Sequence, residues 1–594
     1  MLLRRLLPRA ALGVGVGSAG ACVYAAASGN GESLRAHAEA SIRACRLAAC
    51  CAQIASDYKA AQHWLDEESD DIRALQREHN RMQQEAGAAE RVRATTRSKE
   101  AERHAQQTRE EATKLGEQLA ALRLEHASDN DLATRWSALH TTCAQRLLAM
   151  CMANGGVYVK LGQHLAQLDY IVPEPYIRTL AALFEHNAPS PPEAIHALIE
   201  TELGARADEL YERFDETPIA SASLAQVHVA YERATGRKVA VKCQHPRLRE
   251  ASKADMAAVA LAVKAASWLF ADDFRLAWIL DELAPHLPLE LDFEHEAENL
   301  ERCRAFFAPG GEGASVGKSV VLPEVFYGLS SKRVLTMSFE EGVRVTDSEG
   351  LDAMGAPPSA VTRLLSECFC SLVFRGHFVH ADPHPGNVLV RRVDAGSGMR
   401  SGTQFALVLL DHGLYRELPA YFTHLYAQLW QSVLMGDADG IRRVSFELGV
   451  GEYYPLLAAM LTGRPWGDIL SAGGSQSPSR LAERGTAEDK AQIRGYAQQY
   501  LKQIVKIMEL VPAPMLLIFK TNDCLRHIER QLLGQSGGGE SFVIMLRYCV
   551  HALLHERMAS SNSFVVWLLR VCLDGAQGLG LRTFGALSRA LSVT

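Results

Sequence analysis

Two short motifs, close together in the chain, constrain its fold more than any other feature. The first reads HADPHPGN over residues 380–387, and the second reads DHG over residues 411–413. Phosphoryl transfer from a nucleotide needs a carboxylate near the accepting oxygen and oxygen ligands for Mg²⁺. We interpret Asp382 as that carboxylate and Asn387 and Asp411 as the ligands.

The segment between the motifs predicts how they meet in space. Apolar runs at residues 387–393 and 405–410 read as strands, and residues 395–403 between them form turns readily. The resulting β-hairpin would bring Asp411 back beside Asn387. This layout is typical of the catalytic and metal-binding loops of protein-kinase-like enzymes. A simple turn at the first motif is the alternative, but two motifs in this order with a hairpin between them are hard to reach by chance.

Length and composition set the class of protein. The chain has 594 residues, too many for one hydrophobic core, and its hydrophobic share of 48% and charged share of 22% are ordinary globular values. A net charge of −7 gives no global attraction to nucleic acid, so we expect no nucleic-acid partner. The 13 cysteines are scattered without zinc-site spacing, which favours a reducing compartment and no structural metal.

The first 33 residues resemble a targeting segment. Arg4, Arg5 and Arg9 precede any acidic residue, which indicates a mitochondrial peptide or, as an alternative, a plastid one. The small apolar run at residues 10–28 is just long enough to anchor the chain in a membrane. A secretory signal is the rival interpretation, and the scattered thiols argue against it. We expect a mitochondrial location associated with the inner membrane.

A helical arm follows at residues 34–140, where Pro is absent and Ala, Glu, Gln, Arg and Lys are abundant. Heptad spacing is interrupted at His79 and Arg93, so a coiled coil is not established and a solvated arm is the simpler interpretation. A protein partner that binds this arm is a further hypothesis. Next, Lys160 and Gln163 lie in a helical pattern, where such residues usually face water.

A nucleotide-binding lobe is predicted at residues 216–345. Residues 214–218 read as the end of a helical segment, and the alternating run at residues 238–242 reads as the return strand of a hairpin. That strand ends at Lys242. That strand matches the kinase strand whose lysine holds nucleotide phosphates. Its acidic partner should come from residues 289–299, where spacing alone does not choose among the glutamates. Met337 would stand beside an adenine pocket, although a core methionine explains it equally well.

Taken together, these residues resemble the UbiB-like, AarF-domain-containing (ADCK) atypical kinases from about Leu147 to Leu532. The segments 409–415 and 520–523 look most like the mitochondrial ADCK subclass numbered one. The matching features are the KxGQ motif at Lys160 and Gln163, the small-residue loop of Ala220, Ser221, Ala222 and Ser223, the lysine strand, the ExD motif at Glu290 and Asp292, the downstream Glu296, and the two opening motifs.

The resemblance implies an α+β, atypical protein-kinase-like two-lobed fold with an N-terminal helical extension. It implies that Lys242 pairs with Glu296 and contacts the phosphates of ATP, that Asn387 and Asp411 bind Mg²⁺, and that Asp382 is the catalytic base. The predicted domains are a targeting peptide or anchor (1–33) and a helical, alternatively coiled-coil, arm (34–140), both from residue composition, followed by a helical extension (141–215), an N-lobe (216–345) and a helical C-lobe with C-terminal helices (346–594).

The resemblance also implies roles for the KxGQ helix and for the small-residue loop at residues 220–223. Lys160 and Gln163 would lie on a helix folded across the active site, facing Glu290 and Asp292, and would limit access by protein substrates. Residues 220–223 carry Cβ atoms where kinases use glycines, which should alter the nucleotide pose. The Ser at position 221 interrupts the family's usual alanine stretch and His412 replaces the usual Phe of kinases.

The helical C-lobe should contain amphipathic helices at residues 421–449 and 491–510. The segment at residues 564–591 should dock on the kinase core, with a membrane surface as the alternative.

The leading hypothesis is an ATP-binding, Mg²⁺-dependent atypical kinase or ATPase that acts in mitochondrial ubiquinone or lipid homeostasis, with protein phosphorylation less strongly implied. Its partner would be an isoprenoid or quinone lipid, or another small molecule, at a mitochondrial membrane. One alternative is a non-catalytic ATP-binding scaffold, a pseudokinase. The other is a small-molecule phosphotransferase.

Overall fold

The computed structural model confirms the predicted α+β class, and the chain divides into two compact units, Met1–Leu183 and Phe184–Thr594. The structure describes residues 31–61, 70–96, 99–127, 130–166, 172–184, 188–269, 287–393, 405–462, 466–467, 469–470, 506–507, 510–534 and 539–560. The predictions for residues 1–30, for the hairpin turn at 395–403, for 491–505 and for 564–591 fall outside these ranges.

In its described part, the first unit is built from helices. They are α2 (Gly31–Ala61), α4 (Asp70–Thr96), α5 (Lys99–Ala127), α6 (Asn130–Asn154), α7 (Gly156–Ala166) and α8 (Glu174–Leu180). The expected helical arm is therefore present, but it is divided into separate helices. Helices α2 and α6 pack together, and the hydroxyl of Tyr58 lies 2.6 Å from Nδ1 of His140 across their contact.

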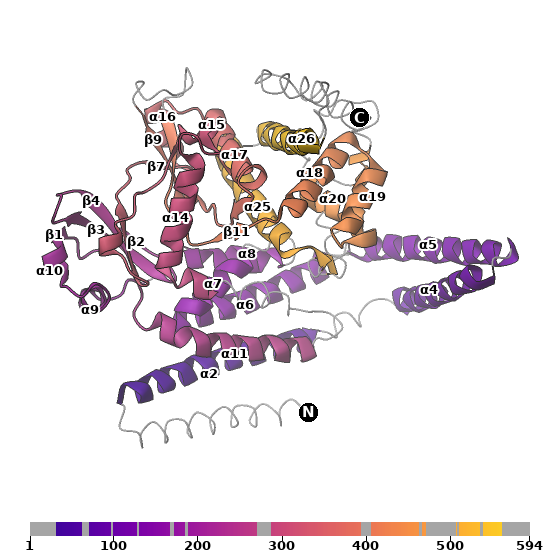
Figure 1. The fold of residues 1–594 in the computed structure, drawn as a ribbon. Helices are drawn as coiled ribbons and strands as arrows, with labels where there is room; N and C mark the ends of the chain where they lie inside the picture. The colour runs from indigo at the N-terminus through magenta and orange to yellow at the C-terminus, as the bar shows by residue number, and fades with distance from the viewer. Residues whose placement is uncertain are drawn as a thin grey trace. The chain divides into compact units, whose positions relative to one another are not determined.

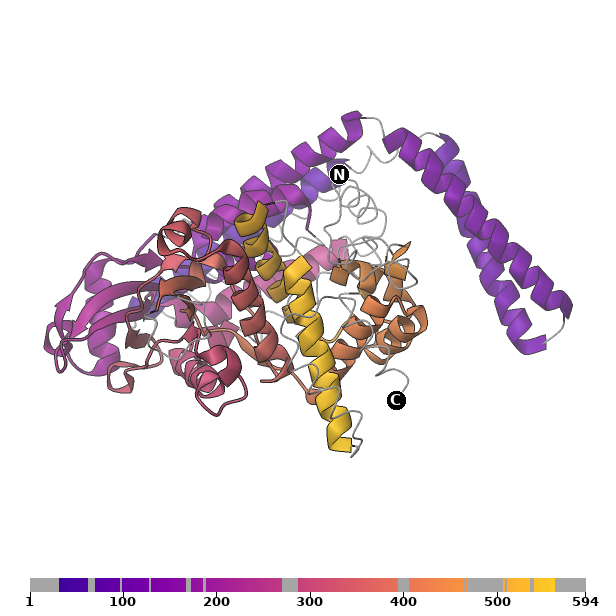
Figure 2. The ribbon, with the colours of Figure 1, turned by 90° about the horizontal axis from the view of Figure 1, so that it is seen from above.

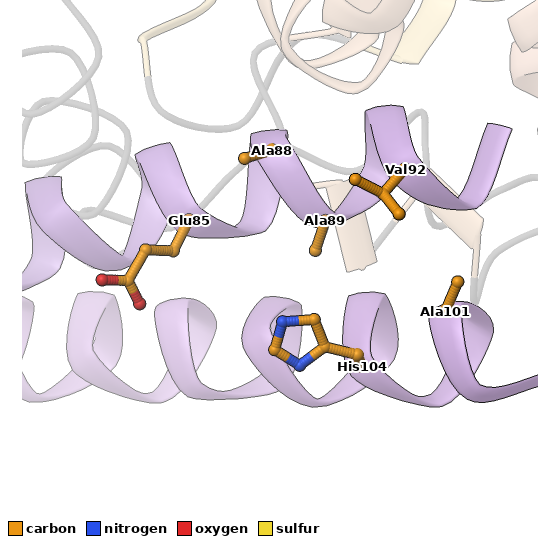
Figure 3. Close-up of a pocket in the computed structure, with 6 residues that line it drawn as sticks. All are labelled: Glu85, Ala88, Ala89, Val92, Ala101 and His104. Carbon is orange, nitrogen blue, oxygen red and sulfur yellow. The ribbon is translucent and has the colours of Figure 1, made fainter. Parts of the chain in front are cut away.

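Helices α4 and α5 lie side by side as a long hairpin (Figures 1 and 2). Small residues form much of its seam, because Ala89, Ala105 and Ala112 are buried together with Met82 and Leu119. A pocket lies between the two helices, as Figure 3 shows, and none of the predicted site residues lines it. Its lining residues are Glu85, Ala88, Ala89, Val92, Ala101 and His104. Within the described ranges, every helix is too short or too polar to cross a lipid bilayer.

The second unit contains an antiparallel sheet whose strands run in the order β1-β3-β4-β6. The strands are β1 (Tyr211–Phe214), β2 (Ala220–Ser221), which pairs with β3, then β3 (Ala225–Glu232), β4 (Lys238–Gln244) and β6 (Val334–Ser338). Successive side chains of a strand point to opposite faces. Val239, Val241 and Cys243 therefore pack on helix α9 (Pro192–Leu203), and Lys242 belongs to the other face.

That other face carries helix α14 (Phe293–Phe307). Phe293, Ala297 and Leu300 of α14 form a core with Leu335 and Met337 of β6. The predicted hairpin strands therefore form, but the prediction that a helical segment ends at residues 214–218 is wrong, because the last helix before them is α10 (Ala207–Leu210). Residues 211–214 instead extend as β1 and pair with β3, because a sheet partner outweighs the weak helical pattern of four residues.

A second sheet has the strand order β5-β10-β9-β7, and its strand β10 ends just before Asp411. Its strands are β5 (Val320–Val321), β7 (Val343–Arg344), β9 (Val388–Arg392) and β10 (Phe405–Leu409). The antiparallel pair β9–β10 confirms the two strands that we predicted around the hairpin turn. A short ladder joins β8 (Phe378–His380) to β11 (Tyr415–Glu417).

Helices surround these strands. The predicted helical region at 421–449 contains α18 (Ala420–Met435) and α19 (Ala438–Glu447), which separate where Gly436 has a φ of 61° and Asp437 caps α19 by accepting from the amide of Gly440. The others are α10 (Ala207–Leu210), α11 (Leu248–Leu269), α13 (Leu287–Glu290), α15 (Ala314–Gly317), α16 (Ser348–Met354), α17 (Pro358–Phe374), α20 (Tyr454–Thr462), α25 (Ala513–Leu533) and α26 (Gly539–Ser560).

Candidate functional site

Lys242 stands at the centre of a cluster of charged side chains. Its Nζ donates to both carboxylate oxygens of Glu296, at 2.7 and 2.8 Å, and to Oδ1 of Asp411 at 3.3 Å. The Lys242 side chain is 17% exposed and that of Glu296 only 4%. Strand β4, helix α14 and the segment after β10 thus bring together three residues that are far apart in the sequence.

Helix α14 aims Glu296 at the lysine because of how the helix begins. Asp292 is its N-cap, and the Asp292 side chain accepts from the backbone amide of Glu294 at 3.2 Å. Glu296 follows within the first turn and points to the buried face. Spacing alone left the acidic partner open, and the structure pairs Lys242 with Glu296, as the resemblance implied. Glu290 instead lies in the short helix α13.

The electrostatics of the cluster follow from one ammonium facing two carboxylates. Burial favours the neutral amine, but Asp411 and Glu296 outweigh it and raise the pKa of Lys242. Burial also raises the pKa of Glu296 to about 7, against the attraction of Lys242 and with the repulsion of Asp411. The cluster therefore carries an excess of negative charge when all three groups are ionised.

The two predicted metal ligands lie together. The amide of Leu410 donates to the carbonyl oxygen of Asn387 at 3.0 Å, which places the next residue, Asp411, beside it. Nδ2 of Asn387 lies 3.3 Å from Oδ2 of Asp411, and the amide of Gly413 donates to Oδ1 of Asp411 at 3.1 Å. The β9–β10 pairing, with Val388 opposite Leu409, produces this approach.

The side-chain oxygen atoms of these two residues are suitable ligands for Mg²⁺. Mg²⁺ prefers oxygen ligands and is usually held by one or two protein groups together with waters and substrate phosphates. Asn387 and Asp411 offer one amide oxygen and one carboxylate, which is such a set. The described residues contain no group of three or more His, Cys, Asp or Glu side chains that could hold a metal by themselves.

The predicted catalytic base, Asp382, follows strand β8. The backbone amide of Asp382 donates to Nδ1 of His380 at 3.2 Å, and the amide of Ala381 donates to the carbonyl of Leu414 at 3.0 Å. Because β8 pairs with β11, the loop of Asp382 and the loop of Asp411 are joined at one ladder. Thr521 of α25 adds a hydrogen bond from its hydroxyl to the carbonyl of His380 at 3.2 Å.

His412, which follows Asp411, is buried and makes polar contacts. Its Nε2 lies 3.1 Å from the carbonyl of Leu409, so this nitrogen carries the proton, and Nδ1 accepts from the hydroxyl of Tyr415 at 3.0 Å. Burial lowers the pKa of His412 to about 3, so the ring is neutral. Nδ2 of Asn299 on α14 donates to the His412 carbonyl at 3.1 Å.

The small-residue loop lies on the neighbouring hairpin. Ala220 and Ser221 form β2 and pair with Val227 and Gln226 of β3, while Ala222 donates its amide to the carbonyl of Ala225 at 2.8 Å. Ser223, the last member of the predicted loop, is buried. Since Val227 in turn pairs with Lys242 of β4, strand β3 lies between the loop strand β2 and the lysine strand β4.

Met337 and the segment after it connect the two sheets. Met337 is 7% exposed and packs in the core between the sheet and α14, as the alternative interpretation expected, and its predicted place beside the base stays a prediction. Glu340, three residues later, accepts from the Ser338 hydroxyl and from Nη1 of Arg391 on β9, both at 2.6 Å.

Lys160 and Gln163 lie on α7 in the first unit. Nε2 of Gln163 donates to the carbonyl of Leu183 at 2.9 Å. A Cβ at Gly162, between them, would lie 2.4 Å from Leu183 Cδ1, so a larger residue there would require the Leu183 side chain to shift. The predicted contact of Lys160 and Gln163 with Glu290 and Asp292 involves the other unit and stays a prediction.

Two supporting residues escaped the sequence analysis. Asn299 could have been found from its spacing, because it lies three residues after Glu296 and so on the same face of α14. Thr521 had no local signal, since its contact with His380 joins positions 141 residues apart.

Comparisons with known proteins point to one protein family. Residues 182–445 match the model of the ABC1 atypical kinase-like domain. The AarF domain-containing protein kinase 1 of Mus musculus is 38% identical over 447 residues, 75% of this chain and 81% of that protein. The ABC1 family protein MCP2 of Saccharomyces cerevisiae is 34% identical over 440 residues, 73% of this chain and 75% of that protein.

A solved structure, that of Rv3197 from Mycobacterium tuberculosis in complex with erythromycin, covers 72% of this chain and 99% of its own. Its TM-score is 0.38 and its sequence identity 21%. The relationship to known proteins therefore rests on the sequence matches.

Proposed function

Because the chain belongs to the ABC1 (AarF domain) family of atypical kinase-like proteins, we propose that it binds ATP with Mg²⁺ and acts as an ATPase or small-molecule phosphotransferase. The single observation that carries the proposal is the ion-paired cluster of Lys242, Glu296 and Asp411 beside Asn387. A kinase-like site needs an ammonium held for the phosphates and oxygen ligands for the metal, and the cluster has both.

Each residue has a distinct part in this proposal. Glu296 holds the Lys242 ammonium in place, so that the lysine can bind the phosphates of the nucleotide. Asn387 and Asp411 would hold Mg²⁺, which supplies positive charge against the phosphate oxygens. Asp382, on the loop joined to that of Asp411 through β8 and β11, would accept the proton of the attacking hydroxyl or water.

The acceptor and the location extend the proposal. We infer an isoprenoid or quinone lipid, or a small molecule of similar kind, as the partner, and a mitochondrial membrane as the place of action. The arginine-rich, acid-free start of the chain supports the location. The α4–α5 hairpin offers a polar surface for a protein partner, and the net charge of −7 speaks against nucleic acid.

Phosphate release from ATP tests the activity. The full-length protein is assayed with Mg²⁺, with and without vesicles that contain a quinone lipid, beside Asp382→Asn. We expect release by the wild type, faster with the lipid, and a loss of at least about 100-fold in the variant, as for removal of a catalytic base. Equal release by both proteins would make Asp382 dispensable, and binding of ATP without release would favour the scaffold function.

A further inference from the structure

A polar network contacts the loop of residues 220–223 and includes none of Lys242, Glu296, Asp382, Asn387 and Asp411. Ser190, just before α9, donates its backbone amide to Oε1 of Gln226 at 2.6 Å, and its hydroxyl lies 2.9 Å from Nδ1 of His245. Nε2 of His245 lies 2.9 Å from the carbonyl of Ala222. His245 follows β4 directly, three residues after Lys242.

The chemistry of the partners settles the direction of every hydrogen bond that His245 makes. A carbonyl oxygen only accepts, so Nε2 of His245 carries the proton and donates to Ala222. Nδ1 then has a lone pair and accepts from the Ser190 hydroxyl. Burial lowers the pKa of His245, in agreement with a neutral ring.

A second series of hydrogen bonds starts from Ser190 and fixes the position of this serine. Nε2 of Gln226 lies 2.8 Å from Nε2 of His228, and Nδ1 of His228 lies 2.8 Å from the carbonyl of Asp215. The same reasoning makes Nδ1 of His228 the donor and Nε2 the acceptor. Gln226 and His228 are fully buried, so their orientation is held by packing as well.

Both backbone polar groups of Ala222, in the middle of the loop, are hydrogen-bonded. The amide of Ala222 donates to the carbonyl of Ala225 at 2.8 Å, and the carbonyl of Ala222 accepts from His245. His245 is tied to the same hairpin through its own amide, which donates to the carbonyl of Leu224 at 3.0 Å. The hydrogen bond from the His245 imidazole therefore helps to fix the position of the loop.

We propose that His245, oriented by Ser190, is a positioning residue that sets the loop of residues 220–223 for the nucleotide phosphates. The inference rests on the proposed ATP binding and deepens it. An alanine- and serine-containing loop lacks the freedom of a glycine loop, so its approach to phosphates depends on where it is held. Loss of the hydrogen bond from His245 to Ala222 should weaken nucleotide binding and leave the chemical step at Asp382 and Asp411 largely unchanged.

The test measures the Kd of a fluorescent ATP analogue and the kcat and KM of phosphate release in the full-length protein with Mg²⁺. In His245→Leu, loss of the bond to a loop carbonyl should raise Kd and KM about tenfold with kcat within about twofold. Ser190→Ala should raise Kd about threefold, and His245→Gln, which keeps an amide donor, should recover most of the affinity. His196→Gln is the matched control, because His196 is in the same unit and contacts Glu216 instead of the loop.

The outcomes separate this inference from the proposed function. A wild-type protein that binds the analogue and a folded His245→Leu that binds it equally well would overturn the positioning role and leave ATP binding intact. A loss confined to kcat would also overturn it. Should His245→Leu not fold, Ser190→Ala decides by the same criterion. No binding by the wild type would overturn both.

Discussion

The ammonium of Lys242 donates to both carboxylate oxygens of Glu296, at 2.7 and 2.8 Å, in a setting where Glu296 is almost wholly buried. Removing one partner of such a pair leaves a buried charge uncompensated. Removing Lys242 would leave two carboxylates uncompensated, because Asp411 is the second carboxylate at the same nitrogen. In the proposed function the same lysine also holds the nucleotide phosphates, which would link the stability of the site to its affinity for phosphate.

Lys242→Met should destabilise the protein by about 3 kcal/mol, because two carboxylates lose their shared cation. Adding Glu296→Gln to that variant should restore most of the loss in Tm, while nucleotide binding stays absent. Thermal melting and analogue binding measure the two effects. Lys264→Met, at an exposed position of α11, is the control. An unchanged Tm in Lys242→Met would contradict the account of the cluster.

The pH dependence of stability should show the raised pKa of Glu296, which burial brings to about 7. A carboxyl whose folded pKa exceeds its unfolded value binds more protons when folded, so its contribution is complete below about pH 4.5 and is lost as the pH rises to about 7. Relative to Glu296→Gln, which cannot ionise, the wild type should lose on the order of 1–3 kcal/mol between pH 5 and 8. A Tm difference that stays flat over this range would refute the assignment.

His412→Phe should lower stability by about 1–2 kcal/mol, because the buried carbonyl of Leu409 and hydroxyl of Tyr415 lose a hydrogen-bond partner. The phenyl ring matches the residue usual in kinases, so its volume is tolerated at the position. Thermal melting of His412→Phe, Tyr415→Phe and the double variant measures the coupling free energy between the two side chains. A loss of stability in the double variant equal to the sum of the two single losses would show that the two side chains share no hydrogen bond.

The pair of Glu340 and Arg391 should couple the first sheet to the second. Their contact is 2.6 Å, with Glu340 13% exposed and Arg391 37% exposed, so solvent screens part of it. A double-mutant cycle with Glu340→Gln and Arg391→Met should give a coupling of about 0.5–1 kcal/mol in thermal unfolding. Independent effects of the two substitutions would mean that the ion pair contributes nothing measurable.

Much of the site could be predicted from the sequence, for reasons visible in particular residues. Asn387 and Asp411 meet because the strands between them carry clear apolar patterns, and a hairpin is a local structure. Lys242 was found on a strand with regular alternation. The choice of Glu296 needed the family resemblance, because four acidic residues stand within a few positions of it.

The rest depended on contacts that no local pattern encodes. Residues 211–214 became a strand through pairing with β3, and the helical arm folded back on itself as α4 and α5. His79, which appeared to interrupt the heptads, packs beside Gly116 of the opposite helix, where a Cβ would lie 3.0 Å from its ring. Ser190 reaches His245 across 55 positions, a distance over which spacing carries no information.

The central claim, a metal-bound nucleotide held by Lys242, Asn387 and Asp411, is tested most directly by ATP-induced thermal stabilisation with and without Mg²⁺. The account predicts a rise in the Tm of the wild type at saturating ATP that requires Mg²⁺, an equal rise in Asp352→Asn at an exposed position of α16, and none in Asp411→Asn. No rise in the wild type, or the same Mg²⁺-dependent rise in Asp411→Asn, would contradict it.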